Sequence, residues 1–149
     1  MEIKNENLSH ISECYSDNLH IEKSKLSCNV ESTTMEDSVF SGVNLSGSFF
    51  QRGEMRGAEF EQMGMANCTF KSTSMTRPDF NNVGMSGAMF SRSDMDRSDF
   101  DGVGLIGAIM TNCDLTGLTI RNCKVGGMTI DGYNVQELIE FYKNNHKGE

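Results

Sequence analysis

Residues 80–90 read Phe-Asn-Asn-Val-Gly-Met-Ser-Gly-Ala-Met-Phe and place a large apolar side chain at positions 80, 85 and 90. The same spacing of five continues without a break in both directions, from Met35 to Ile130. In a chain with 37% hydrophobic residues, chance would produce such a run roughly once in 10⁸ to 10⁹ trials. A period of five fits neither an α-helix nor a flat strand. It indicates a chain that turns a corner after every fifth residue.

Twenty apolar residues follow this spacing, and we call them the centres. The centres are Met35, Phe40, Leu45, Phe50, Met55, Phe60, Met65, Phe70, Met75, Phe80, Met85, Phe90, Met95, Phe100, Leu105, Met110, Leu115, Ile120, Val125 and Ile130. Glycine or asparagine stands two positions after thirteen of them. Both residue types tolerate positive φ, which a type II turn requires at its third position. Each five-residue unit is therefore predicted to be a short extended segment followed by a turn.

Four of these units, Val43–Gly47, Ser93–Arg97, Ser98–Gly102 and Cys113–Gly117, resemble the tandem signature Ala-(Asp/Asn)-(Leu/Phe)-x-x of the pentapeptide-repeat family. The resemblance covers about residues 28–132. It implies an all-β fold, a right-handed quadrilateral β-helix with four pentapeptides in each coil. Residues twenty apart would then stack in columns, such as Phe40 over Phe60. Five coils at the inter-strand spacing of about 4.8 Å would form a rod roughly 24 Å long.

The two ends depart from the regular repeat. Residues 1–27 are expected to form an irregular N-terminal cap or degenerate coil before the β-helix of residues 28–132. Within this region Ile11, Ile21 and Leu26 keep spacings of five but lie one residue out of phase with Val30. We therefore predict a single-residue slip between Leu26 and Val30.

The five-residue period stops after Ile130, and residues 133–149 are predicted to form a short C-terminal α-helix and tail. Asn134 is placed as its N-cap, with Glu137 at the third helical position. Apolar residues then recur at helical spacing. They are Val135, Leu138, Ile139 and Tyr142. This apolar side is predicted either to cover the last coil or, as the resemblance implies, to form the contact of a homodimer.

The composition argues against several classes of function. A formal net charge of −8, from 21 acidic and 13 basic residues, disfavours direct binding of nucleic acid. No apolar run approaches the roughly 18 residues of a membrane span, and residues 1–18 lack a signal-peptide core. We therefore expect a cytoplasmic protein without membrane contact.

No residue pattern points to catalysis or to a bound group. His10 and His20 are not accompanied by a nucleophile or a third partner, and no paired cysteine motif suggests zinc. Small residues stand two positions before many centres and are predicted to fill the core. Cys68, Cys113 and Cys123 occupy this position, and Cys28 stands likewise two positions before Val30, whereas Cys14 receives no role. We expect no enzyme, no metal and no cofactor.

The outward positions sort into faces of different polarity. An acidic stripe is predicted beside the Phe40 column, with Arg121 at its far end. The acidic stripe consists of Glu59, Glu61, Asp79, Asp99 and Asp101. A partly apolar and basic contact strip is predicted on the opposite side. The contact strip consists of Phe49, Arg52, Lys71, Met89, Arg92 and Ile109. Of the other two sides, one is nearly uncharged and one mixes both signs.

These features favour a non-catalytic scaffold that binds another protein through its β-helix faces. An alternative is mimicry of a nucleic-acid backbone by regularly spaced carboxylates, which would compete for a basic groove. Resemblance to family members that bind type II topoisomerases such as DNA gyrase, and confer quinolone resistance, implies such a partner. A further alternative is an immunity protein that blocks a toxin. The simplest alternative for the acidic stripe is an ordinary solvated surface.

Overall fold

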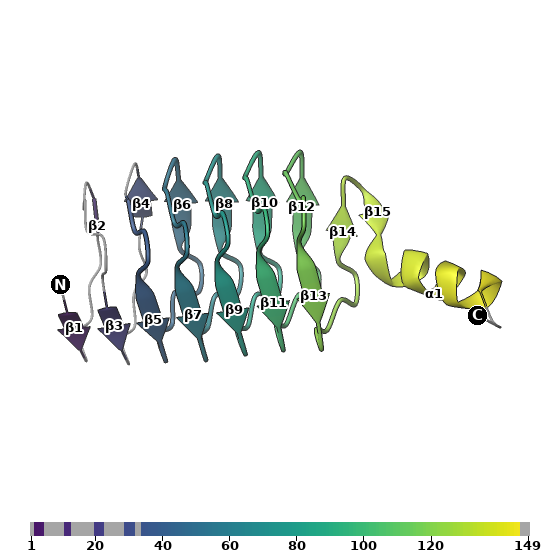
Figure 1. Cartoon of the computed structure of the whole chain (residues 1–149), viewed down its shortest axis with the longest axis horizontal. Coiled ribbons are helices and arrows are strands. Elements are labelled where there is room, and N and C mark those ends of the chain that lie inside the picture. Colours follow the sequence, from purple (N-terminus) through teal and green to yellow (C-terminus); the bar gives the residue numbers. More distant parts are fainter. Residues whose placement is uncertain (1, 5–10, 13–19, 23–28, 32–33, 147–149) are drawn as a thin grey trace.

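The five-residue period is wound into a four-sided rod in the computed structural model, with a helix projecting from its C-terminal end (Figure 1). The structure describes residues 2–4, 11–12, 20–22, 29–31 and 34–146, with side chains from residue 34 onward. Two sides of the rod are parallel β-sheets. The other two sides are columns of single β-bridges, such as Asn44 to Gly64 and Thr34 to Glu54.

The two sheets are built from alternate short strands of the chain. Sheet A contains β1 (Glu2–Lys4), β3 (His20–Glu22), β5 (Val39–Ser41), β7 (Glu59–Glu61), β9 (Asp79–Asn81), β11 (Asp99–Asp101) and β13 (Thr119–Arg121). Sheet B contains β2 (Ile11–Ser12), β4 (Asn29–Glu31), β6 (Phe49–Gln51), β8 (Thr69–Lys71), β10 (Met89–Ser91), β12 (Ile109–Thr111), β14 (Thr129–Ile130) and β15 (Tyr133–Asn134). Centres pair with centres one coil away, as Phe60 does with Phe80.

The core of the rod confirms the predicted columns of centres. Every centre from Met35 to Met110 is buried. The rings of Phe60 and Phe80 lie 4.7 Å apart with their planes 7° from parallel, and those of Phe70 and Phe90 lie 4.8 Å apart. Stacking at the coil spacing lets each ring bury its faces against identical neighbours, which removes large apolar areas from water.

The corners of the rod take a left-handed backbone more uniformly than the sequence indicated. All twenty residues that stand two positions after a centre have positive φ. Seven of them are neither glycine nor asparagine. These seven are Asp37, Arg52, Gln62, Ser72, Arg77, Arg92 and Arg97. Closing a four-sided coil with five-residue sides imposes the turn at each corner, so the geometry of the fold overrides the residue preference.

The N-terminal strands extend both sheets with shortened coils. Ile11 pairs with Val30 and Ile21 pairs with Phe40, each across 19 residues instead of 20. This spacing agrees with the predicted slip of one residue. Of the residues in that prediction, Leu26 lies outside the described part of the chain. His10, Cys14 and Cys28, which the sequence analysis also considered, lie outside it as well.

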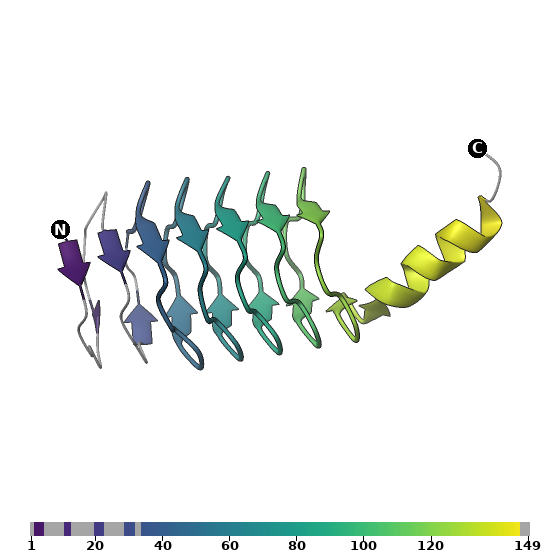
Figure 2. The ribbon, with the colours of Figure 1, turned by 90° about the horizontal axis from the view of Figure 1, so that it is seen from below.

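The C-terminal helix begins as predicted but does not cover the last coil. In α1 (Val135–Asn145), the Asn134 side chain accepts a hydrogen bond from the Glu137 N–H at 3.2 Å. The preceding strand β15 turns back antiparallel on β14, and α1 then leads away from the rod (Figure 2). No residue of α1 is buried. Val135 packs against the core at the start of α1, but the rest of the helix does not form the expected lid, because the β14–β15 hairpin directs the chain outward.

The last coil consequently keeps an open end. Its four centres are only half-buried, although they pack against the core. They are Leu115, Ile120, Val125 and Ile130. Among the residues that the structure describes, no helix is long and apolar enough to cross a membrane.

A pair of alanine substitutions tests the corner geometry. Gly107 has a φ of 66° and open space where a Cβ would lie, whereas Gly104 lacks the left-handed backbone and would meet its nearest neighbours at 3.9 Å. We expect Gly107→Ala to lower the free energy of unfolding by about 1 kcal/mol and Gly104→Ala to change it little. Urea titration of both variants measures the difference. Equal effects would contradict the strain argument.

Candidate protein-binding surfaces

The acidic stripe lies on the outer surface of sheet A. Glu59 pairs with Asp79 in the ladder, and Asp79 pairs with Asp99. Glu61 and Asp101 flank Asn81 in the neighbouring column. All five carboxylates therefore project from one face, as the repeat arithmetic predicted. A role in binding remains a prediction.

The charge of the stripe is compensated at its C-terminal end. The Arg121 guanidinium lies 2.6 Å from one carboxylate oxygen of Asp99 and 3.8 Å from Asp101. The other oxygen of Asp99 is buried and accepts no hydrogen bond from the described residues. Partial burial, followed by repulsion from Asp99, raises the pKa of Asp79, which Arg121 opposes. Burial and the like charge of Asp99 on the adjacent coil therefore both disfavour the ionised form of Asp79.

The contact strip on sheet B is divided by a polar residue. Phe49, Thr69, Met89 and Ile109 form one ladder column in that order. Met89 and Ile109 are 46% and 43% exposed, whereas Phe49 is half-buried. Thr69 therefore separates Phe49 from the apolar pair.

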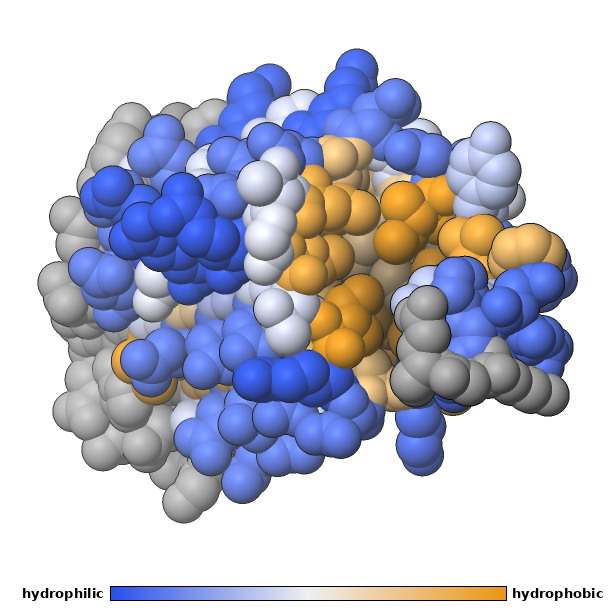
Figure 3. All heavy atoms as spheres, turned by 45° about the vertical axis from the view of Figure 1, so that its right-hand side comes forward, coloured by the Kyte–Doolittle hydropathy of each residue, from blue (hydrophilic) through white to orange (hydrophobic). Residues whose placement is uncertain are grey.

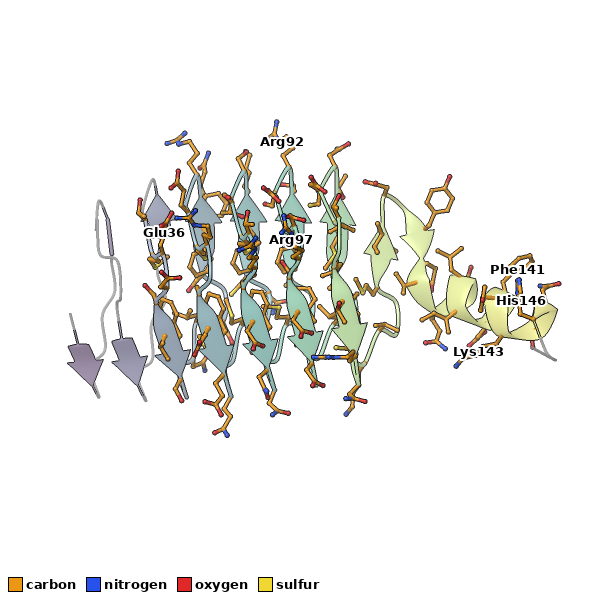
Figure 4. The ribbon with its side chains drawn as sticks, viewed as in Figure 1. Glu36, Arg92, Arg97, Phe141, Lys143 and His146 are labelled. Carbon is orange, nitrogen blue, oxygen red and sulfur yellow. The ribbon has the colours of Figure 1, made fainter. Side chains whose placement is uncertain are left out.

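The basic residues of this strip lie at its border. Lys71 ends β8, and Arg52 and Arg92 occupy the adjoining corner, where both have positive φ. Figure 4 shows Arg92 projecting from the outer edge of sheet B. The cations are thus offset from the exposed apolar pair rather than interleaved with it.

Ile106 is exposed at the corner that leads into Ile109, although the sequence pattern assigned it no role. It is 50% exposed, and its carbonyl accepts a hydrogen bond from the Gly87 N–H. The equivalent corner positions in other coils carry Ser46, Ala66 and Ser86. An isoleucine at a corner otherwise given to small residues was the signal available in the sequence.

On the side with mixed charges, acidic and basic side chains form local ion pairs. The Arg56 guanidinium lies 2.8 Å from Glu36 one coil away, and Arg97 pairs with its neighbour Asp96 at 2.9 Å. Figure 4 places Glu36 and Arg97 midway between the two sheets. These exposed pairs are typical of a solvated surface and contribute little stability.

The cysteines of the described region are core or near-core residues. The Cys68 thiol is buried and donates to the Leu45 carbonyl at 3.0 Å, which confirms its predicted packing role. Cys113 and Cys123 are half-exposed in the last coil, and burial raises the pKa of the Cys123 thiol. Within the described residues, no three His, Cys, Asp or Glu side chains gather where they would hold a metal ion.

The pKa shifts of Asp79 and Asp114 predict that neutralising these two carboxylates changes the stability of the protein in opposite directions. Because the pKa of Asp79 is raised in the folded rod, the contribution of Asp79 to stability becomes more favourable as the pH falls through that pKa. We expect Asp79→Asn to stabilise the protein at pH 7 and to lose this advantage in acid. Hydrogen bonds from Thr116 lower the pKa of Asp114, so Asp114→Asn should destabilise at pH 7 and approach wild type in acid. Urea titrations at several pH values measure the free energy of unfolding of both variants. If both substitutions changed it in the same direction at pH 7, the directions of the two pKa shifts would be contradicted.

Comparisons with known proteins agree with this geometry. A family model described as pentapeptide repeats matches residues 27–62 and 79–117, in eight copies. A trypsin-treated form of QnrB1, a plasmid-mediated fluoroquinolone resistance protein, superposes with a TM-score of 0.54 at 15% identity, covering 94% of this chain and 97% of that one. A second trypsin-treated form has a TM-score of 0.51 at 16% identity, with 95% and 96% covered.

Another similar solved structure is HetL, a pentapeptide repeat protein involved in heterocyst differentiation regulation from the cyanobacterium Nostoc sp. strain PCC 7120. It is 12% identical with a TM-score of 0.32, covering 90% of this chain and 91% of that one. No curated protein sequence matches this chain significantly. Because the repeat model matches half of the chain and the structure has the corresponding four-sided coil, this protein belongs to the pentapeptide-repeat family.

Proposed function

We propose that this protein is a non-catalytic scaffold that binds another protein through the outer faces of its β-helix. The observation that carries the proposal is the division of one rigid rod into faces of distinct polarity. Sheet A is acidic, sheet B carries cations and an exposed apolar cluster, and the Gly64–Gly84–Gly104 side is nearly uncharged. Such a rod orients several chemically different surfaces at constant spacing, which suits recognition by complementarity.

The acidic stripe favours a partner with a basic surface. Its carboxylates repeat at the coil spacing of about 4.8 Å, and their side chains project from strands held on both sides by the ladder. Regularly spaced charge on a stiff support steers a cationic partner and sets its register. The compensating Arg121 at one end gives the stripe a direction along the rod.

The C-terminal end favours a homodimer. Leu138, Ile139 and Tyr142 of α1 are 53%, 37% and 60% exposed, and the neighbouring last coil is only half-buried. Figure 3 shows hydrophobic residues gathered at this end of the molecule beside the helix. A contiguous apolar surface of this kind is typical of an interface. We propose that a second copy covers it.

The regular carboxylates also support a second candidate, mimicry of a nucleic-acid backbone toward a type II topoisomerase such as DNA gyrase. QnrB1, whose fold this chain shares, is described as a fluoroquinolone resistance protein. A supercoiling assay with purified gyrase tests this candidate. We expect the wild-type protein to alter supercoiling in a dose-dependent way. An unchanged supercoiling rate at high molar excess would exclude it.

Neutralising part of the stripe tests the scaffold proposal directly. The variant Glu59→Gln, Glu61→Gln, Asp79→Asn removes three carboxylates while leaving the Arg121 pairs in place. We expect it to capture at least about tenfold less of the stripe-dependent partner from cell lysate, because the steering charge is lost. Quantitative mass spectrometry of the captured proteins measures the change.

A matched control removes the same charge elsewhere. The variant Asp37→Asn, Glu54→Gln, Asp131→Asn changes the net charge equally but leaves the stripe and α1 intact. It should capture the partner as wild type does. If both variants captured every protein equally well, the stripe would be an ordinary solvated face, and the acidic surface would play no part in the function.

A further inference from the structure

Three exposed apolar side chains form a cluster on the flank of the rod, and we call Met89, Ile106 and Ile109 the apolar flank. Met89 lies directly beside Ile109 in the sheet B ladder. Ile106 occupies the corner that leads into Ile109, and its carbonyl bonds the Gly87 N–H of the coil that carries Met89. Their exposed fractions are 46%, 50% and 43%. These side chains therefore form one surface across two adjacent coils.

The two chain segments that carry the apolar flank are uncharged, and each contains two glycines. Residues 84–89 and 104–109 contain no acidic or basic side chain. Gly107 has open space where a Cβ would lie, and Gly104 would meet its nearest atoms only at 3.9 Å. Another backbone can thus approach closely without burying a charge, which would otherwise be costly. The equivalent positions in earlier coils carry Ser46, Phe49, Ala66 and Thr69. Phe49 is half-buried, so the exposed large apolar side chains of the described coils lie in the C-terminal half of the rod.

Helix α1 offers a surface of matching chemistry that its own rod does not cover. Its exposed apolar residues include Leu138, Phe141 and Tyr142. Figure 2 shows the helix leading away beyond the last coil, and Figure 4 shows Phe141, Lys143 and His146 along its distal part. Eleven helical residues extend about 16 Å. That length corresponds to about three coils of a β-helix.

We propose that the apolar flank is the docking site for α1 of a second copy of this chain, and that the two copies dock reciprocally. The inference rests on the homodimer proposed above. In a two-fold arrangement with the C-terminal ends facing each other, a helix that projects past its own last coil lies beside the C-terminal coils of the other copy. Those coils carry the exposed isoleucines and Met89.

The charges at the border of the two surfaces are complementary. Lys124 stands at the C-terminal end of the uncharged side, in the column that continues Gly84 and Gly104. Glu137 lies in the first turn of α1, the part nearest the junction of the two copies. A lysine on one copy would thus face a glutamate on the other, and the two-fold symmetry repeats the pair.

The association of the full-length protein tests the docking site. We expect wild type to sediment as a concentration-dependent dimer, and Ile106→Glu with Ile109→Glu to weaken its dissociation constant at least about hundredfold, because each interface would bury two unpaired charges. Ser46→Glu is the matched control. It places one glutamate at the same corner position three coils earlier, beyond the reach of the helix, and should dimerise as wild type does.

Disulfide formation between two differently labelled chains tests the same contact without adding charge. Mixing an Ile106→Cys chain with a Leu138→Cys chain should yield a covalent heterodimer. A Ser46→Cys chain mixed with the Leu138→Cys chain should yield only the background that each variant shows alone from the native cysteines. This readout also decides the case in which the double glutamate variant fails to fold.

Two results would overturn the inference in distinguishable ways. A wild-type protein that stays monomeric at all concentrations removes both the homodimer and the docking site, while leaving partner capture through the acidic stripe untouched. A dimer that survives Ile106→Glu with Ile109→Glu but is lost in Leu138→Glu keeps the homodimer and removes the apolar flank as its site.

Discussion

The stacking of each centre on the equivalent centre of the next coil is the constraint on which the rest of the molecule depends. The coil spacing of a parallel ladder, about 4.8 Å, is also a favourable distance between parallel aromatic rings, as the 4.7 Å between Phe60 and Phe80 shows. A residue that moved one position would leave its column and face water. The inward register therefore determines which residues point outward, and with them the polarity of every face.

The corners join this core to the outward faces of the rod. Each corner takes a left-handed backbone, and glycine or asparagine adopts it at little cost. Where Arg77, Arg92 and Arg97 occupy corners instead, the fold tolerates local strain and places a long cationic side chain at the edge of a face. Core packing across coils outweighs that local cost.

Each inner coil is stabilised by packing against the coils on both sides of it, and the last coil lacks one of these neighbours. An inner coil is covered on both sides, whereas the half-buried Leu115, Ile120 and Val125 lack a following coil. In a solenoid this open end must be covered by a cap or by another molecule. Because the β14–β15 hairpin sends α1 away from the rod, the end of the repeat and the exposed helix lie next to each other, and together they form the surface that we propose a second copy covers. The same geometry thus connects the stability of the rod to its proposed oligomeric state.

Much of this architecture was predictable from residue spacing, because a period of five acts locally and repeats without a slip from Met35 to Ile130. The inward columns and the position of the acidic stripe followed from that pattern, and the N-cap at Asn134 followed from the spacing of Asn134 and Glu137. The direction of α1, the raised pKa of Asp79 and the union of Ile106 with Met89 did not. Each of these features depends on residues that are far apart in the chain. The direction of α1 depends on how the hairpin leaves the last coil, and the pKa of Asp79 depends on how neighbouring coils exclude water. A local sequence pattern does not contain this information.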